Sequence, residues 1–109
     1  MLGMRLSELQ RIFTLNVAKL IQWAYDQGYE LTFGESFNAA GTGHMKNSNH
    51  YIRLAQDLNL FKDNEYLTKS DSYKPLGSFW VSLHPLNRWG GDFKSKDGNH
   101  FSMLWEGRA

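Results

Sequence analysis

The chain contains four histidines, and two of them stand beside acidic residues in polar, turn-rich surroundings. Asp57 follows His50 by seven positions, and Asp97 precedes His100 by three. Two histidines and one carboxylate, with a fourth position open to water, form the donor set of a catalytic zinc ion. The chain has no cysteines, so any metal ion must be held by His, Asp or Glu side chains.

The seven-residue step restricts how His50 and Asp57 could share a metal ion. On a helix they would lie about 10 Å apart, and on a strand they would point to opposite faces. They converge only where His50 lies on a loop before the strand of Asp57, or where a bulge intervenes; the neighbouring residues favour the loop. His100 would complete the site from an adjacent strand, and Asp97 could act there as general base and then general acid. Because His-x6-Asp is common by chance, solvated surface histidines remain the alternative on spacing alone.

The elements that must position these side chains begin with one long helix. Apolar side chains recur at helical spacing over residues 7–27, which predicts an amphipathic helix packed on a sheet. Ser7 and Gln10 fit a capping box, with Leu6 as its hydrophobic staple. Gly28 stands where helices commonly end in the left-handed conformation.

Short strands around a second helix are predicted for the remainder of the chain. The segments with strand character are residues 29–34, 53–61, 87–93 and 99–104. The other predicted elements are a mobile loop over residues 35–49, a turn at 62–65, a short helix over 75–83 and a polar turn at 94–98. This order predicts an α+β fold, a mostly antiparallel sheet with one long N-terminal helix and a short second helix. A single domain over residues 1–109 is expected.

Composition and charge argue against several classes of protein. With 41% hydrophobic and 21% charged residues, the chain is expected to be globular. A formal net charge of +1 argues against nucleic-acid binding, and so against a ββα-metal nuclease, which also uses His and Asn. No apolar run approaches the roughly 20 residues that span a membrane. The first residues also lack a secretory signal core, so neither membrane insertion nor signal-peptide export is expected.

Two segments of the chain resemble a known family of enzymes. SNHYIRLAQDLNLF, residues 48–61, resembles the Ser-x-His-x6-Asp signature of zinc peptidases related to D-Ala-D-Ala carboxypeptidases. It looks most like their phage branch, the L-alanyl-D-glutamate endopeptidase endolysins. HPLNRWGGDFKSKDGNHFSM, residues 84–103, is similar to the same branch, in which Trp-Gly-Gly precedes a final Asp-x-x-His motif. The similarity covers roughly residues 29–108, and two motifs in the right order are more specific than either alone.

The resemblance implies a role for each residue of the candidate site. His50, Asp57 and His100 would hold one zinc ion, Asp97 would be the catalytic acid/base, and Ser48 would orient the first histidine or the substrate. The implied fold is the small α+β domain shared with hedgehog-type proteins. The implied function is that of a phage endolysin that hydrolyses a peptidoglycan stem-peptide bond, L-Ala-D-Glu. We expect a monomer that accumulates in the host cytoplasm before its release to the periplasm and cell wall.

Two alternatives stay open within this resemblance. D-Ala-D-Ala carboxypeptidases and dipeptidases share the metal set and differ in their loops. Phage-type relatives also carry an arginine-rich stretch after the first strand, whereas here Gly34 and Glu35 lead into a loop without arginine, in which Lys46 is a substitute cation. A zinc-binding, non-catalytic, hedgehog-like binding module is therefore the alternative to an enzyme.

Several other conspicuous residues are interpreted as structural. His84 is expected to flank the end of the short helix, where a cationic side chain is favourable, and His44 to be a solvated loop residue. Gly90-Gly91 indicates a bulge or a close backbone approach beside the site. The tryptophans expected to fill the core are Trp23, Trp80 and Trp89.

Overall fold

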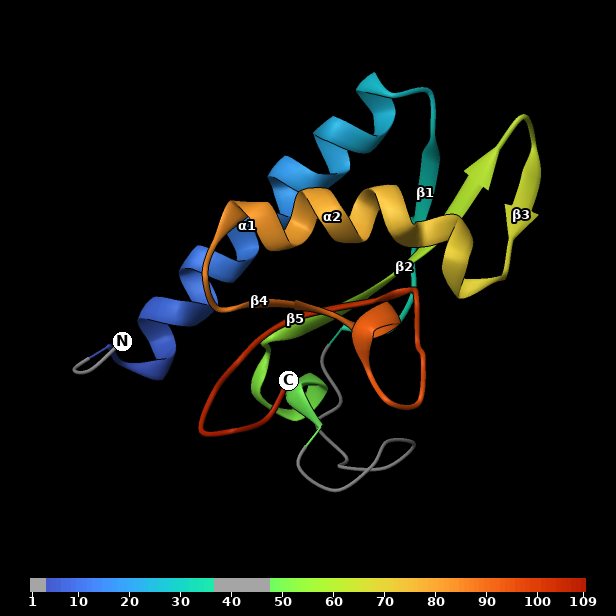
Figure 1. Cartoon of the computed structure of the whole chain (residues 1–109). Coiled ribbons are helices and arrows are strands. Elements are labelled where there is room, and N and C mark those ends of the chain that lie inside the picture. The colour runs from blue at the N-terminus through green and yellow to red at the C-terminus, as the bar shows by residue number, and fades with distance from the viewer. Residues whose placement is uncertain (1–3, 37–47) are drawn as a thin grey trace.

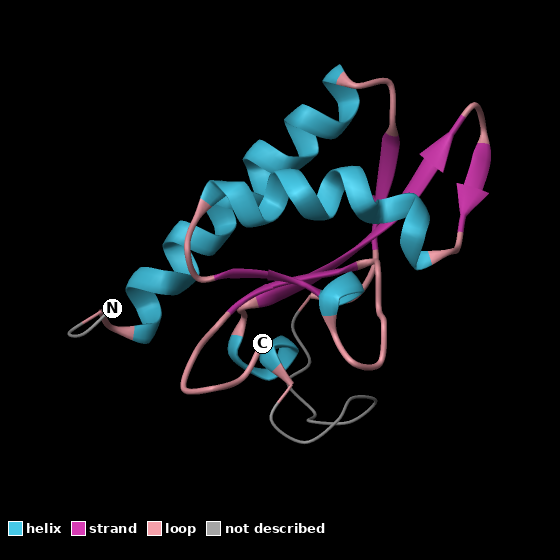
Figure 2. Cartoon of the chain, viewed as in Figure 1, coloured by secondary structure: helices cyan, strands magenta, loops and turns pink. Residues whose placement is uncertain are grey.

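The computed structural model describes residues 4–36 and 48–109, in which two helices cover one face of an antiparallel sheet (Figure 1). The helices are α1 (Leu6–Asp26) and α2 (Lys74–Leu83), which pack on each other. The strands are β1 (Glu30–Phe33), β2 (Ala55–Lys62), β3 (Glu65–Leu67), β4 (Asn87–Trp89) and β5 (His100–Met103). Short 3-10 turns connect them, namely η1 (Asn49–Ile52), η2 (Ser70–Tyr73) and η3 (Gly90–Asp92) (Figure 2). The predicted α+β fold is confirmed.

β2 is the central strand of this sheet. The strands run in the order β1-β2-β5-β4, and β3 pairs with the C-terminal end of β2. Every pairing among the described strands is antiparallel. β2 begins two residues later than predicted because Arg53 adopts a left-handed conformation (φ 56°) that ends η1. The register places Asp57 of β2 directly opposite His100 of β5, and this pairing positions the site.

α1 matches its prediction in length but not in its cap. The Glu8 carboxylate accepts a hydrogen bond from the backbone N–H of Arg5 at 3.2 Å. Ser7 lies inside the helix, so the predicted capping box of Ser7 and Gln10 is wrong. The helix begins after Arg5 because Glu8 lies three residues after Arg5, where its carboxylate can accept from the N-cap backbone and places a negative charge in the first turn. The other end is as predicted, since Gly28 adopts a φ of 87°.

The hairpin strand β3 and the end of β4 differ from the sequence-based prediction. Asp63 and Asn64, with φ of 52° and 64°, form the predicted turn as a two-residue hairpin that pairs β3 with β2. β3 was not predicted because its three residues are too few to show an alternating pattern. The strand predicted over residues 87–93 ends at Trp89, where the chain turns into η3.

The hydrophobic core lies between the helices and the sheet. Trp80 is fully buried, and its indole N–H donates a hydrogen bond to the carbonyl of Arg88 at 2.9 Å. Trp89 is buried as well. Trp23 is only partly buried and stacks on Phe79, so the core prediction holds for Trp80 and Trp89 and only in part for Trp23.

His84 follows α2 as an uncharged acceptor and not as the expected cation. The backbone N–H of Leu86 donates a hydrogen bond to Nδ1 of His84 at 3.0 Å. Burial lowers the pKa of His84, which favours the neutral ring that this hydrogen bond requires.

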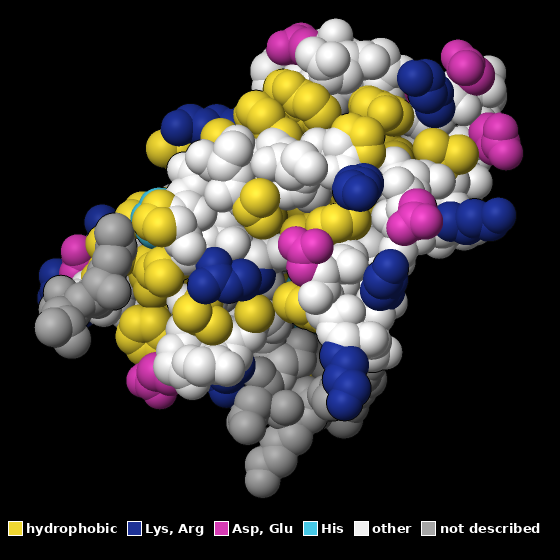
Figure 3. Space-filling model, in the orientation of Figure 1, with side chains coloured by type: hydrophobic (Ala, Val, Ile, Leu, Met, Phe, Trp, Pro, Cys, Tyr) yellow, Lys and Arg dark blue, Asp and Glu magenta, His cyan; other side chains and the backbone are white. Residues whose placement is uncertain are grey.

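The outer surface mixes charges of both signs. On the face in Figure 3, Lys and Arg side chains are interspersed with Asp and Glu. Large apolar side chains that are exposed include Leu15, Tyr25, Phe33, Tyr66 and Val81. Within residues 4–36 and 48–109, no helix is long and apolar enough to cross a membrane.

Candidate functional site

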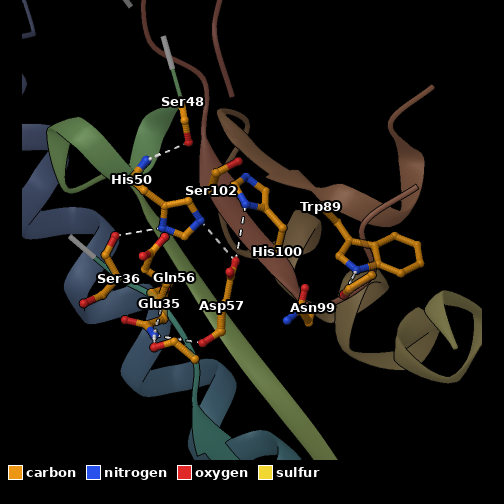
Figure 4. A network of polar contacts seen from close by, with 12 residues as sticks. Glu35, Ser36, Ser48, His50, Gln56, Asp57, Trp89, Asn99, His100 and Ser102 are labelled. Atoms are coloured by element: carbon orange, nitrogen blue, oxygen red, sulfur yellow. Dashed lines mark hydrogen bonds and ion pairs between the residues drawn. The ribbon is translucent and has the colours of Figure 1, made fainter. Parts of the chain in front are cut away.

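Three elements bring His50, Asp57 and His100 together (Figure 4). His50 lies in η1, immediately before β2, Asp57 lies in β2, and His100 is the first residue of β5. Nε2 of His50 is 3.2 Å from Oδ1 of Asp57, and Nδ1 of His100 is 3.5 Å from the same oxygen. Of the two arrangements that the seven-residue step allowed, the favoured one, with His50 before the strand of Asp57, is the one that the chain adopts.

The three side chains form a compact cluster of donor atoms. Each offers one ligand atom, and these atoms lie within 4.8 Å of one another. Both histidines are buried, whereas the side chain of Asp57 is 17% exposed to solvent. Asp57 is therefore the most exposed of the three side chains.

Backbone contacts fix the orientation of His50. Nδ1 of His50 lies 2.8 Å from the carbonyl oxygen of Ser36. A carbonyl can only accept, so Nδ1 donates to it, and in the neutral ring that a metal ligand requires Nδ1 carries the proton and Nε2 keeps the lone pair. Ser48 holds the backbone of His50, because its Oγ accepts a hydrogen bond from the backbone N–H of His50 at 3.3 Å and so caps η1. A histidine whose second nitrogen donates to a backbone carbonyl is the arrangement typical of metal ligands.

The donor set fits a zinc ion. In a tetrahedral site with bonds of about 2.0–2.2 Å, neighbouring donor atoms lie about 3.3–3.6 Å apart. The two distances to Oδ1 of Asp57, 3.2 and 3.5 Å, are close to that spacing. Oδ1 is shielded from solvent, and within the described residues no hydrogen bond of good geometry reaches it. A buried carboxylate oxygen in this state is stabilised by a cation.

Nearby charges set the protonation of the metal-free cluster. Burial alone would lower the pKa of His50, but the Asp57 carboxylate, the Ser36 carbonyl and the charge of Glu35 together raise it. Burial alone would raise the pKa of Asp57, but the two histidines lower it. The ionised carboxylate that a metal needs is therefore in place at neutral pH, whereas the metal must displace a proton from His50 as the pH falls.

We expect zinc affinity to fall as the pH falls through the raised pKa of His50. The decline should begin above the ordinary histidine value of about 6.5. Below the raised pKa, each pH unit should weaken apparent affinity about tenfold, because one proton competes with the metal for Nε2. Competition with a chromophoric chelator between about pH 8.5 and 5.5 measures this dependence. His84→Ala is the control, since it removes a histidine outside the cluster and should leave the profile unchanged; a constant affinity down to about pH 6 would contradict the expectation.

Asp97 lies outside the donor cluster, on the turn between η3 and β5, and its side chain is exposed. The backbone N–H of Asp97 donates to the carbonyl of Gly90 at 2.9 Å. The carbonyl of Asp97 accepts from the backbone N–H of His100 at 3.1 Å. One turn therefore positions both the third donor and the predicted acid/base, whose part in proton transfer stays a prediction.

Gly90 shows the close backbone approach that the Gly90-Gly91 pair predicted. A Cβ at Gly90 would lie 2.0 Å from the carbonyl oxygen of Asp97 and 2.8 Å from the Cβ of His100. Neither of these atoms is the end of a flexible side chain. Only glycine therefore allows the two segments to approach this closely.

Sequence reasoning missed two residues that hold the site, Ser36 and Ser70. The hydroxyl of Ser70 accepts a hydrogen bond from the N–H of Gly98 at 2.9 Å, and the indole N–H of Trp89 donates to the Gly98 carbonyl at 2.7 Å. Ser36 acts through its carbonyl, which any residue offers, and Ser70 lies 28 positions from Gly98. Neither contact has a sequence signal.

Part of the predicted loop over residues 35–49 lies outside the described residues. His44, expected to be solvated, and Lys46, considered as a substitute for the missing arginine, both belong to that part.

Comparisons with known proteins bear on the fold and the family of the chain. The chain is similar in structure to the Serratia marcescens L-Ala D-Glu endopeptidase ChiX, with a TM-score of 0.63 and 20% sequence identity over 92% of this chain and 86% of that chain. The comparison with curated proteins gives no match. A family profile described as D-alanyl-D-alanine carboxypeptidase matches residues 40–103, a stretch that includes all three donors of the cluster and Asp97. Because this stretch is more than half of the 109 residues, the chain belongs to the D-alanyl-D-alanine carboxypeptidase family of peptidases, as its motifs predicted.

Proposed function

We propose that the chain is a zinc-dependent peptidase that hydrolyses the L-Ala-D-Glu bond of the peptidoglycan stem peptide, and that it serves a bacteriophage as an endolysin. The observation that carries the proposal is the convergence of donor atoms of His50, Asp57 and His100 within 4.8 Å of one another. Membership of the peptidase family supports hydrolysis of a peptide bond. The similarity to a protein described as an L-Ala D-Glu endopeptidase supports the choice of bond.

The residues of the site divide the chemistry between them. A zinc ion held by His50, Asp57 and His100 would supply a Lewis acid at the scissile carbonyl. Asp97 would take the proton of the attacking water and deliver it to the leaving amine. Its side chain is exposed and lies outside the donor cluster, so it would not be a metal ligand.

A polar cavity next to Asp97 offers room for part of the substrate. Its volume is about 230 Å³. Its lining is rich in hydroxyl groups and includes Tyr66, Thr68, Ser70, Tyr73 and Lys96. Such a lining can form hydrogen bonds with the amides and carboxylates of a stem peptide.

We further propose that the protein acts as a monomer and reaches the wall by release from the host cytoplasm through a holin. One chain supplies all three donors of the cluster, so a single copy suffices to form the metal site. The localisation is an expectation from phage-type relatives. Efficient export from cells that lack a lysis partner would contradict it.

The test is digestion of purified Gram-negative peptidoglycan with and without a zinc chelator, followed by mass spectrometry of the new peptide ends. We expect ends at L-Ala-D-Glu that vanish with chelator and return when zinc is added. New ends at D-Ala-D-Ala would instead support a carboxypeptidase, the activity that the family description names. An intact wall after treatment with zinc-loaded protein would contradict the proposal and favour a non-catalytic binding module or a degenerate lysin.

A further inference from the structure

Asn49 is the residue directly before His50, and its side chain is completely buried. Its Nδ2 group donates two hydrogen bonds, to the carbonyl of Met103 at 2.6 Å and to the carbonyl of Arg108 at 3.0 Å. These partners lie 54 and 59 positions further along the chain. The amide therefore joins the turn that carries His50 to the C-terminal part of the molecule.

The contact with Met103 ties together the two segments that carry the histidines. Met103 is the last residue of β5, and His100 is the first. The backbone N–H of Met103 also donates a hydrogen bond to the carbonyl of Leu54 at 3.1 Å. The backbone N–H of Leu54 in turn donates to the carbonyl of Asn49 at 3.0 Å. η1 is thus held to the end of β5 by side-chain and backbone bonds around one buried amide.

The second contact extends the same clamp to the C-terminal turn. Residues 105 and 108 pair through two backbone hydrogen bonds, of 2.8 and 2.9 Å, which orient the carbonyl of Arg108. Two carbonyl oxygens facing one buried group require a side chain with two donors and no charge. Asparagine meets that requirement, whereas aspartate would place its oxygens against the two carbonyls.

We propose that Asn49 is a positioning residue of the metal centre, whose amide sets the placement of His50 relative to His100 by clamping η1 to β5. The hydrogen bonds of the Asn49 side chain go to the backbone carbonyls of Met103 and Arg108, so it acts on the metal site through the backbone. The proposal rests on the proposed function for the presence of zinc. It adds the element that holds the donors at their spacing.

Asn87 provides a matched control. It is also buried, its Nδ2 donates to a backbone carbonyl, that of Trp80 at 2.9 Å, and on β4 it pairs with Met103 and not with a residue of the cluster. In both asparagines, Oδ1 has no hydrogen-bond partner within the described residues. Substitution at Asn49 or Asn87 therefore removes a buried amide of the same kind.

The experiment compares Asn49→Ala and Asn49→Asp with Asn87→Ala and Asn87→Asp. Zinc affinity is measured by chelator competition, the site is probed by the absorption spectrum of the Co²⁺-loaded protein, and the stability of the metal-free protein is measured by urea unfolding. All four variants should lose stability. Only the Asn49 variants should lose zinc affinity, by about 10–100-fold as for other residues that orient metal ligands, and show an altered Co²⁺ spectrum.

Each outcome decides the proposal. Asn49 variants that bind zinc as tightly as the Asn87 variants, with a wild-type Co²⁺ spectrum, would overturn it while leaving the proposed peptidase intact. A wild-type protein that binds no zinc would overturn both. If the Ala and Asp variants at Asn49 do not fold, Asn49→Ser keeps one donor and should show a smaller loss of zinc affinity; unchanged affinity in that variant would also overturn the proposal.

Discussion

Replacement of Asp97 by asparagine is expected to lower kcat for stem-peptide cleavage roughly 10²–10⁴-fold, the contribution typical of general acid–base catalysis. Asparagine has nearly the same size as aspartate but cannot accept a proton near neutral pH. Zinc affinity should be retained, because Asp97 is not part of the donor cluster. The bonds that fix the turn use the backbone of Asp97 and not its carboxylate, so the substitution leaves them in place.

Asp92 allows the effect of charge to be separated from proton transfer. It is an exposed acidic residue of η3 in the same loop, so Asp92→Asn removes one negative charge near the site. That variant should keep the wild-type kcat. The measurement is steady-state cleavage of a defined stem peptide, with zinc content determined on the same samples. Equal kcat for Asp97→Asn and wild type would show that Asp97 is not the proton carrier. Glu35, whose charge contributes to the raised pKa of His50, would then be the next acidic residue to test in that role.

The convergence of the donors could be predicted from the sequence because chemistry and spacing left few solutions for a metal site, and the family resemblance favoured that site over solvated histidines. Without cysteine, a metal site needs His and carboxylate donors. A seven-residue step between His50 and Asp57 excludes one straight helix or strand, which leaves a bulge or, as the neighbouring residues favour, a turn or loop before a strand. η1 followed by β2 is that solution. Such constraints act locally, so they can be read from one segment of the chain.

The remaining features of the site depend on register and on backbone groups, which leave no local pattern. Asp57 faces His100 because β2 pairs with β5 in one register, and that register is set by packing across the whole sheet. Ser36 enters the site by its carbonyl, and Asn49 finds its partners more than fifty positions away. The early end of β4 has the same origin, since η3 begins where Gly90 meets the backbone of a later turn. These contacts exist only once the fold is formed.

The second large effect is expected from Gly90→Ala, which should destabilise the protein by about 1–3 kcal/mol and lower kcat/KM by about 10²-fold. The added Cβ would lie 2.0 Å from the Asp97 carbonyl oxygen, a backbone atom that can move only with its turn. That turn carries Asp97, and the carbonyl of Asp97 accepts a hydrogen bond from the backbone N–H of His100. A shift would therefore misplace the acid/base and a metal donor together, so zinc affinity should fall as well. Urea unfolding, chelator competition and stem-peptide cleavage measure the three effects.

Gly28→Ala shows whether these losses arise from the close approach or from lost stability alone. Gly28 has a φ of 87°, and a Cβ there meets no atom within 4 Å. Alanine at this position is strained by roughly 1–2 kcal/mol, a cost similar to that at Gly90, but far from the donors. Gly28→Ala should therefore unfold at lower urea while it keeps zinc affinity and turnover. If Gly90→Ala behaves in the same way, the turn adapts without moving the site, and the contact of Gly90 with Asp97 does not position the chemistry. If only Gly90→Ala loses zinc and activity, this close contact is part of what holds the catalytic turn against the metal centre.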